Sequence, residues 1–100
     1  MPANEEEILA IRNQIDSLDE QIAKLLKDRL KLALHLAQTK HKLQIPIQDR
    51  TREKDILDRV AKYSDNPEIA KAIKDVYQSI FEVSRDIQKK LPDQNVSTRV

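Results

Sequence analysis

The fold is decided by the stretch KHKLQIPIQDRTRE, residues 40–53, where one helical pattern ends and a second begins. Pro46 disfavours helix at the residue before it and requires an extended connection. Asp49 has a side chain typical of a helix N-cap, so a second helix is expected to start there. Charged side chains of both signs gather around this break. We therefore interpret it as one wall of a candidate anion-binding pocket.

Upstream of the break, apolar residues recur at alternating steps of three and four from Ile8 to Leu43, which predicts one amphipathic helix. Asn4 is a suitable N-cap, and glutamates follow it in the first turn, where the helix dipole favours negative charge. A helix of about 38 residues is roughly 57 Å long. A chain of 100 residues cannot cover that length alone. We therefore expect a second copy of the same chain to cover part of it.

Downstream of the break, the second helix is expected to end around residues 63–65, and Asn66-Pro67 is a strong start signal for a third helix. That helix is expected to end near Leu91-Pro92. The sequence thus predicts an all-α fold with three helices per chain, one long and two shorter, in an intertwined homodimer. We expect one domain over residues 1–91 and a disordered tail over residues 92–100.

The composition excludes several classes of function. The chain has no glycine and no cysteine, which argues against a phosphate-binding glycine loop and a thiolate metal site. Its net charge of +1 suggests no nucleic-acid or membrane partner. The apolar runs are far shorter than the ~18 residues of a membrane span, and the acidic start is unlike a signal peptide. We expect a cytoplasmic protein that needs neither a metal nor a cofactor.

Three basic residues of the first helix stand out from its pattern. Arg29 occupies an apolar seam position, and Lys40 lies eleven residues further on, on the same face and about 16 Å along the axis. Together they could hold a small dianion, although each alone is more often an interface-rim or solvated side chain. Arg12 is about 25 Å from Arg29 along the helix. It can join the same pocket only from another chain, and antiparallel pairing of two first helices that cross near Ala23 would bring it there. The alternative is an ordinary solvated arginine.

Four further polar residues are candidates for the pocket. Ser84 and Gln88 lie one turn apart on the third helix, beside its apolar seam, and both are neutral hydrogen-bonding groups. The alternative is that they form the polar edge of an amphipathic helix. Arg52 and Glu53 open the second helix, where the alternative is simple surface charge. We find no pairing of a nucleophile with a base and no paired carboxylates, so an enzyme with this sequence would act by positioning and electrostatics.

The order and spacing of these residues resemble the all-helical chorismate mutases. The resemblance covers roughly residues 5–91 and rests on the following motifs: Ile11-Arg12-x-x-Ile15-Asp16-x-Leu18-Asp19, Leu26-x-x-Arg29, Lys40, Pro46-Ile47-x-Asp49-x-x-Arg52-Glu53 and Ser84-x-x-x-Gln88. It implies two interlocked chains of three helices that share two active sites. It also implies the rearrangement of chorismate to prephenate, a step toward phenylalanine and tyrosine, without a cofactor.

The resemblance also implies roles for the residues around the carboxylates and the ether oxygen of chorismate. Arg12 would reach a carboxylate in the neighbouring site, whereas Arg29 and Ser84 would bind carboxylate within their own chain. Lys40 and Gln88 would flank the ether oxygen of the breaking C–O bond. Arg29, Lys40 and Gln88 are therefore the predicted catalytic residues.

On the ring side, the resemblance implies that Asp49, through its backbone, and Glu53 hold the ring hydroxyl. Arg52 would shape the pocket wall and help to orient Glu53 or a bound water. Phe81 and Arg85 depart from the family pattern, which has aliphatic residues beside the site. Two alternatives stay open: an isochorismate–pyruvate lyase of the same fold, and a non-catalytic helical dimerisation or regulatory module.

Overall fold

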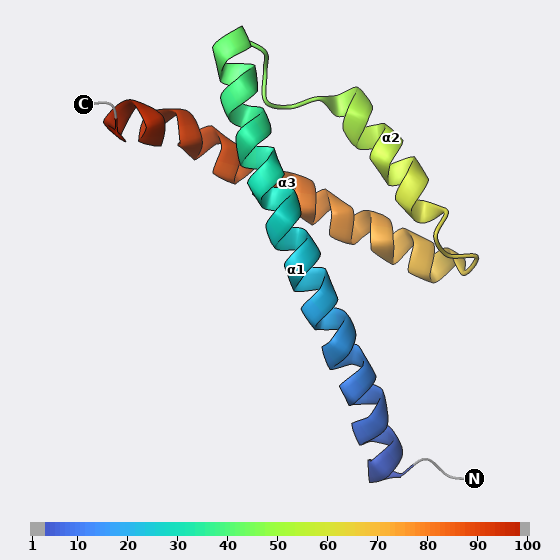
Figure 1. Ribbon diagram of the computed structural model, residues 1–100. Coiled ribbons are helices and arrows are strands. Elements are labelled where there is room, and N and C mark those ends of the chain that lie inside the picture. The colour runs from blue at the N-terminus through green and yellow to red at the C-terminus, as the bar shows by residue number, and fades with distance from the viewer. Residues whose placement is uncertain (1–3, 99–100) are drawn as a thin grey trace. The chain divides into compact units, whose positions relative to one another are not determined.

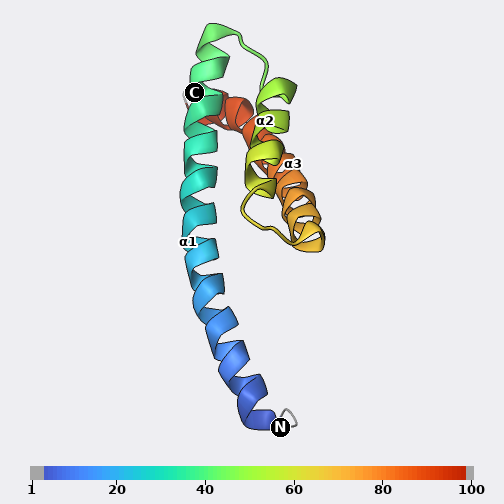
Figure 2. The ribbon, with the colours of Figure 1, turned by 90° about the vertical axis from the view of Figure 1, so that its right-hand side faces the viewer.

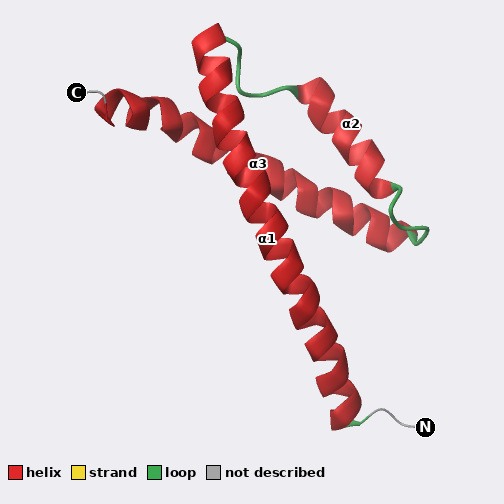
Figure 3. Ribbon diagram, viewed as in Figure 1, coloured by secondary structure: helices red, strands yellow, loops and turns green. Residues whose placement is uncertain are grey.

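A computed structural model describes the backbone of residues 4–98 and the side chains up to Lys90. Within these residues it contains three helices and no strand (Figures 1 and 3). They are α1 (Glu5–Leu43), α2 (Arg50–Ala61) and α3 (Pro67–Thr98). The chain divides into two compact units, residues 1–32 and residues 33–100, and α1 contributes to both. The predicted all-α fold of one long and two shorter helices is confirmed.

Each helix begins at the N-cap that its sequence predicts. Asn4 Oδ1 accepts a hydrogen bond from the backbone N–H of Glu7 at 2.9 Å, and Asp49 Oδ1 accepts one from Arg52 at 3.0 Å. Asn66 Oδ1 accepts from the N–H groups of Glu68 and Ile69. These bonds satisfy backbone donors that have no partner within the first turn of a helix.

The C-terminal end of α1 is closed by a residue in the left-handed conformation. Gln44 has φ 58°, and its N–H donates to the carbonyl of His41 at 3.2 Å. The next N–H, of Ile45, donates to the carbonyl of Lys40 at 2.8 Å. This is the Schellman arrangement, which glycine usually supplies. The helix therefore ends at Leu43 and has 39 residues, close to the predicted length of about 38.

The helix α3 is longer than predicted. It continues through Pro92 to Thr98, so the end expected near Leu91 is wrong. The disordered tail expected over residues 92–100 stays a prediction. A proline removes one backbone donor and crowds the preceding turn, which disfavours a helix without always ending it. Residues 99 and 100 lie outside the described part of the chain. The predicted domain boundary at residue 91 stays a prediction.

In the first unit, α1 exposes its apolar seam. Its large aliphatic side chains are between 47% and 68% exposed: Ile8, Ile11, Ile15, Leu18, Ile22 and Leu25. Apolar area of this extent favours burial against another surface. None of the described helices has an 18-residue stretch apolar enough to cross a membrane.

In the second unit, α2 packs along α3, as both ribbon views show (Figures 1 and 2). The buried apolar residues of this unit are few: Ala33, Ala37, Ile56 and Phe81. The ring of Phe81 meets that of Tyr77 edge to face, with centroids 6.0 Å apart. Two polar residues, Ser84 and Gln88, are buried with them. The unit thus has a small core that contains hydrogen-bonding groups.

Candidate functional site

Six of the eight predicted site residues belong to the second unit: Lys40, Asp49, Arg52, Glu53, Ser84 and Gln88. They come from the end of α1, the start of α2 and the middle of α3. The other two, Arg12 and Arg29, lie on α1 in the first unit. Arg12 is exposed and Arg29 is half-buried. Their predicted place beside the other six stays a prediction.

Lys40 is held by the linker that follows α1. Its side chain is partly buried, and Nζ donates a hydrogen bond to the carbonyl of Ile47 at 3.0 Å. The carbonyl of Lys40 accepts the N–H of Ile45 within the helix cap. An ammonium group has three donors, so this contact leaves donors for a further acceptor. The structure thus places a cation at the break, and Ile47 is a partner that the sequence did not indicate.

Ser84 and Gln88 form a buried hydrogen-bonded pair. Each is 7% exposed, and Gln88 Nε2 donates to Ser84 Oγ at 3.3 Å. No buried side-chain nitrogen or oxygen in the described part of the chain lacks a partner. Both side chains therefore lie inside this unit and not in solvent. The side-chain amide retains one donor and hydrogen-bonding capacity on its oxygen.

Glu53 is joined to α3 by an ion pair. Arg85 Nη1 donates to Glu53 Oε2 at 2.6 Å, and the two side chains are only 21% and 23% exposed. This contact contradicts the alternative that Glu53 is simple surface charge. Sequence reasoning identified Arg85 only as a departure from a pattern. The two partners are 32 residues apart, so no local spacing could have indicated their contact.

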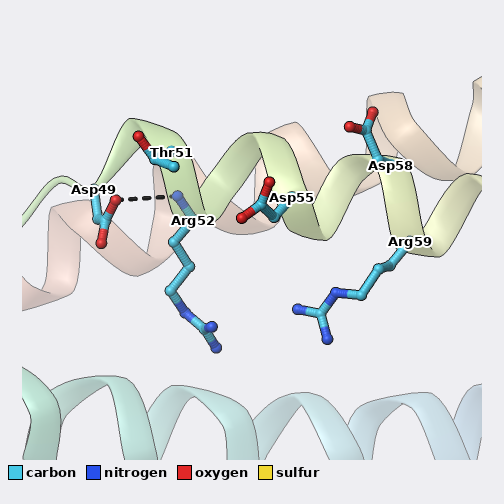
Figure 4. Close-up of a pocket in the computed structure, with 6 residues that line it drawn as sticks. All are labelled: Asp49, Thr51, Arg52, Asp55, Asp58 and Arg59. Carbon is cyan, nitrogen blue, oxygen red and sulfur yellow. Dashed lines mark hydrogen bonds between the residues drawn. The ribbon is translucent and has the colours of Figure 1, made fainter.

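Asp49 and Arg52 lie on an open hollow of about 740 Å³ along α2, together with Thr51, Asp55, Asp58 and Arg59 (Figure 4). The side chains of Arg52 and Arg59 extend from the same side of α2, whereas Asp58 extends from the opposite side (Figure 4). Arg59 was missed by the sequence reasoning. Its spacing of seven residues from Arg52 is the signal that indicates a shared face.

The described residues of the candidate site offer donors and positive charge. Among the side chains that the structure describes, up to Lys90, no group of three or more histidines, aspartates and glutamates is placed to hold a metal ion. The lysine, the buried amide, the hydroxyl and the arginines can bind carboxylates and an oxygen on which charge develops. Such a site can act on a dianion by orienting it and stabilising its charge.

Comparison with known proteins agrees with this chemistry. The family model of chorismate mutase type II matches residues 11–89. A chorismate mutase from Methanocaldococcus jannaschii is 36% identical over 85 residues, covering 84% of this chain and 86% of that protein. A bifunctional chorismate mutase/prephenate dehydratase from Aquifex aeolicus is 30% identical over 92 residues, covering 86% of this chain but only 25% of that protein. The structure of chorismate mutase form II from Thermus thermophilus superimposes with a TM-score of 0.76 at 25% identity, covering 83% of this chain and 94% of that one.

Proposed function

Because this chain belongs to the chorismate mutase type II family, we propose a mechanism by which it converts chorismate into prephenate. The reaction is an intramolecular rearrangement, so the enzyme needs no nucleophile. The enzyme has to hold a flexible dianion in its compact, reactive conformer. Binding groups fixed in the right geometry lower the activation barrier of the rearrangement. In the Aquifex relative a prephenate dehydratase is joined to the mutase, which associates prephenate with aromatic amino acid biosynthesis.

Two donors are proposed to stabilise the ether oxygen as the C–O bond breaks. Lys40 and Gln88 flank this oxygen, where negative charge develops in the transition state. Hydrogen-bond donors already in place are worth most there, because they need no reorganisation during the reaction. The burial of Gln88 beside Ser84 is the observation that carries the proposal. A buried neutral amide is a donor that does not titrate.

The remaining groups are proposed to bind the ends of the substrate. Arg29 binds one carboxylate as a bidentate fork, with Ser84 as a further donor. Asp49, through its backbone, and Glu53 hold the ring hydroxyl, while Arg52 shapes the wall of the pocket. Asp49 already uses a side-chain oxygen in capping α2, which is compatible with a role for its backbone.

A second copy of the chain is proposed to complete each site. The exposed apolar seam of α1 in residues 5–32 is the surface that would pair with it. Antiparallel pairing of two first helices brings the partner subunit's Arg12 to the substrate, where it binds the second carboxylate. Each homodimer then contains two shared sites, as a two-fold axis requires.

Purified protein incubated separately with chorismate and with isochorismate tests the activity. We expect loss of chorismate absorbance with formation of prephenate, and no pyruvate from either compound. Pyruvate released from isochorismate would instead identify a lyase of the same fold. An unchanged chorismate signal, together with dimers in solution, would favour the non-catalytic dimerisation module.

A further inference from the structure

Arg85 makes the contact between α2 and α3 that engages a predicted substrate-binding group. We propose that Arg85 is a positioning residue, which aims the Glu53 carboxylate at the ring hydroxyl of chorismate and offsets its charge beside the dianionic substrate. This inference rests on the proposed function. It adds a ninth residue to the eight proposed for the site.

The geometry of Glu53 supports this role. Its backbone is fixed in the first turn of α2, where its N–H donates to the carbonyl of Asp49 at 3.0 Å. Its side chain is held at the other end, because Oε2 accepts from Arg85 Nη1 at 2.6 Å. A glutamate held at both ends has little rotamer freedom left to lose on binding. A carboxylate accepts through two oxygens, so Oε1 is the atom assigned to the ring hydroxyl.

The positive charge of Arg85 would also offset the negative charge of Glu53 beside the substrate. A glutamate beside a dianion repels it, and the repulsion is strong where water is largely excluded. Arg85 follows Ser84 directly on α3, and its pairing with Glu53 is largely shielded from solvent. A shielded pair is weakened little by salt. The arginine therefore lets a carboxylate serve as an acceptor next to two substrate carboxylates.

A surface ion pair on the same helix provides a matched control. Lys71 Nζ lies 2.8 Å from Asp75 Oδ2, but these side chains are 78% and 61% exposed. The hydrogen bond and the charge of Asp75 raise the pKa of Lys71 above its usual value of 10.5. Lys71 thus resembles Arg85 in being a cation of α3 paired with a carboxylate, but it lies about 20 Å before Ser84 along the helix axis.

The test uses steady-state kinetics of Arg85→Leu, Arg85→Lys, Glu53→Gln, the double variant Arg85→Leu/Glu53→Gln, and Lys71→Leu. For Arg85→Leu we expect KM to rise about tenfold with kcat within about twofold of the wild type, the signature of lost binding common to ground and transition states. Arg85→Lys should recover most of the affinity. The double variant Arg85→Leu/Glu53→Gln should have the same KM as Glu53→Gln alone, because Arg85 acts through the carboxylate of Glu53. Lys71→Leu should have wild-type kinetics.

Two outcomes would overturn the inference while the proposed function stands. One is an increase in KM that is the same with and without Glu53; the other is unchanged kinetics with only a lower melting temperature, which would make Arg85 structural. A wild-type protein that does not turn over chorismate would overturn the proposed function itself, and the inference with it.

Discussion

Lys40 Nζ donates to the carbonyl of Ile47 at 3.0 Å, so the last turn of α1 is tied by a side chain to the linker that leads into α2. The same residue is tied through its backbone, because its carbonyl accepts the N–H of Ile45. A flexible lysine is thereby restricted to the break between the two helices. For a donor to a developing charge, this restriction before substrate arrives is what makes the donor effective.

Replacing Lys40 by methionine should therefore abolish most of the turnover. The substitution keeps the length of the side chain and removes its charge, and we expect kcat to fall by roughly 10²- to 10³-fold, as for loss of one such donor. Lys42→Met is the control, because Lys42 lies in the same last turn and is exposed. Equal losses of chorismate turnover in the two variants would show that only general positive charge matters.

The activity of the wild type should not require acid pH, because Gln88 donates without a titrating proton. Gln88→Glu should create such a requirement. The new carboxyl must be protonated to donate, and burial at this position raises its pKa above the ordinary value of about 4.3. Its rate should consequently rise as pH falls through the raised pKa. A wild-type rate that itself rises steeply below about pH 6 would contradict this role of Gln88.

Sharing of sites between chains is tested by mixing two inactive variants. Arg12→Ala and Lys40→Ala homodimers should both be nearly inactive. After joint unfolding and refolding, about a quarter of the wild-type activity should return, because random pairing makes half of the dimers mixed, each with one intact site. Mixtures that are never unfolded together serve as the control. If refolding restores nothing, Arg12 acts within its own chain or not at all.

The left-handed cap of α1 predicts a stabilising substitution. Gln44 adopts φ 58°, a conformation that costs a non-glycine residue about 1 kcal/mol or more. Gln44→Gly should raise the free energy of unfolding by about 1 kcal/mol in urea titrations at one fixed protein concentration. Gln48→Gly is the control: glycine there should destabilise by about 0.5 kcal/mol, by loosening the unfolded chain alone. If both substitutions raise the free energy of unfolding, the effect comes from glycine anywhere in the linker, and the left-handed conformation of Gln44 is not its cause.

Local signals in the sequence predicted the helices well, because caps act within a few residues. Asn4, Asp49 and Asn66 each cap a helix as expected. The C-terminal ends of α2 and α3 were placed less well. α2 ends at Ala61, before the expected residues 63–65, and α3 continues through Pro92, near which it was expected to end. At the end of α1, the left-handed conformation of Gln44 could not be predicted from the type of its side chain.

The sequence indicated buried candidates for the site where polar residues lie beside an apolar seam. Ser84 and Gln88 were candidates on that ground, and both are buried. The contacts of Lys40 with Ile47 and of Glu53 with Arg85 could not be predicted. They depend on how the linker turns and how α2 packs on α3, and neither is encoded in spacing along one helix.

The exposed apolar seam of α1 also has a consequence for biosynthesis. Residues 5–32 are made before residues 33–90, yet the later unit contains every buried side chain among the described residues. The aliphatic face of residues 5–32 would thus stay exposed to solvent throughout synthesis of the chain. Residues 33–90, by contrast, can bury side chains within the same chain as soon as they are made. Exposed apolar surface of this kind promotes aggregation and binds chaperones until another surface buries it. If a second copy of the chain buries this face, two chains made by neighbouring ribosomes on one mRNA would be close together. They would then pair sooner, and the time during which the apolar face is exposed would be shorter.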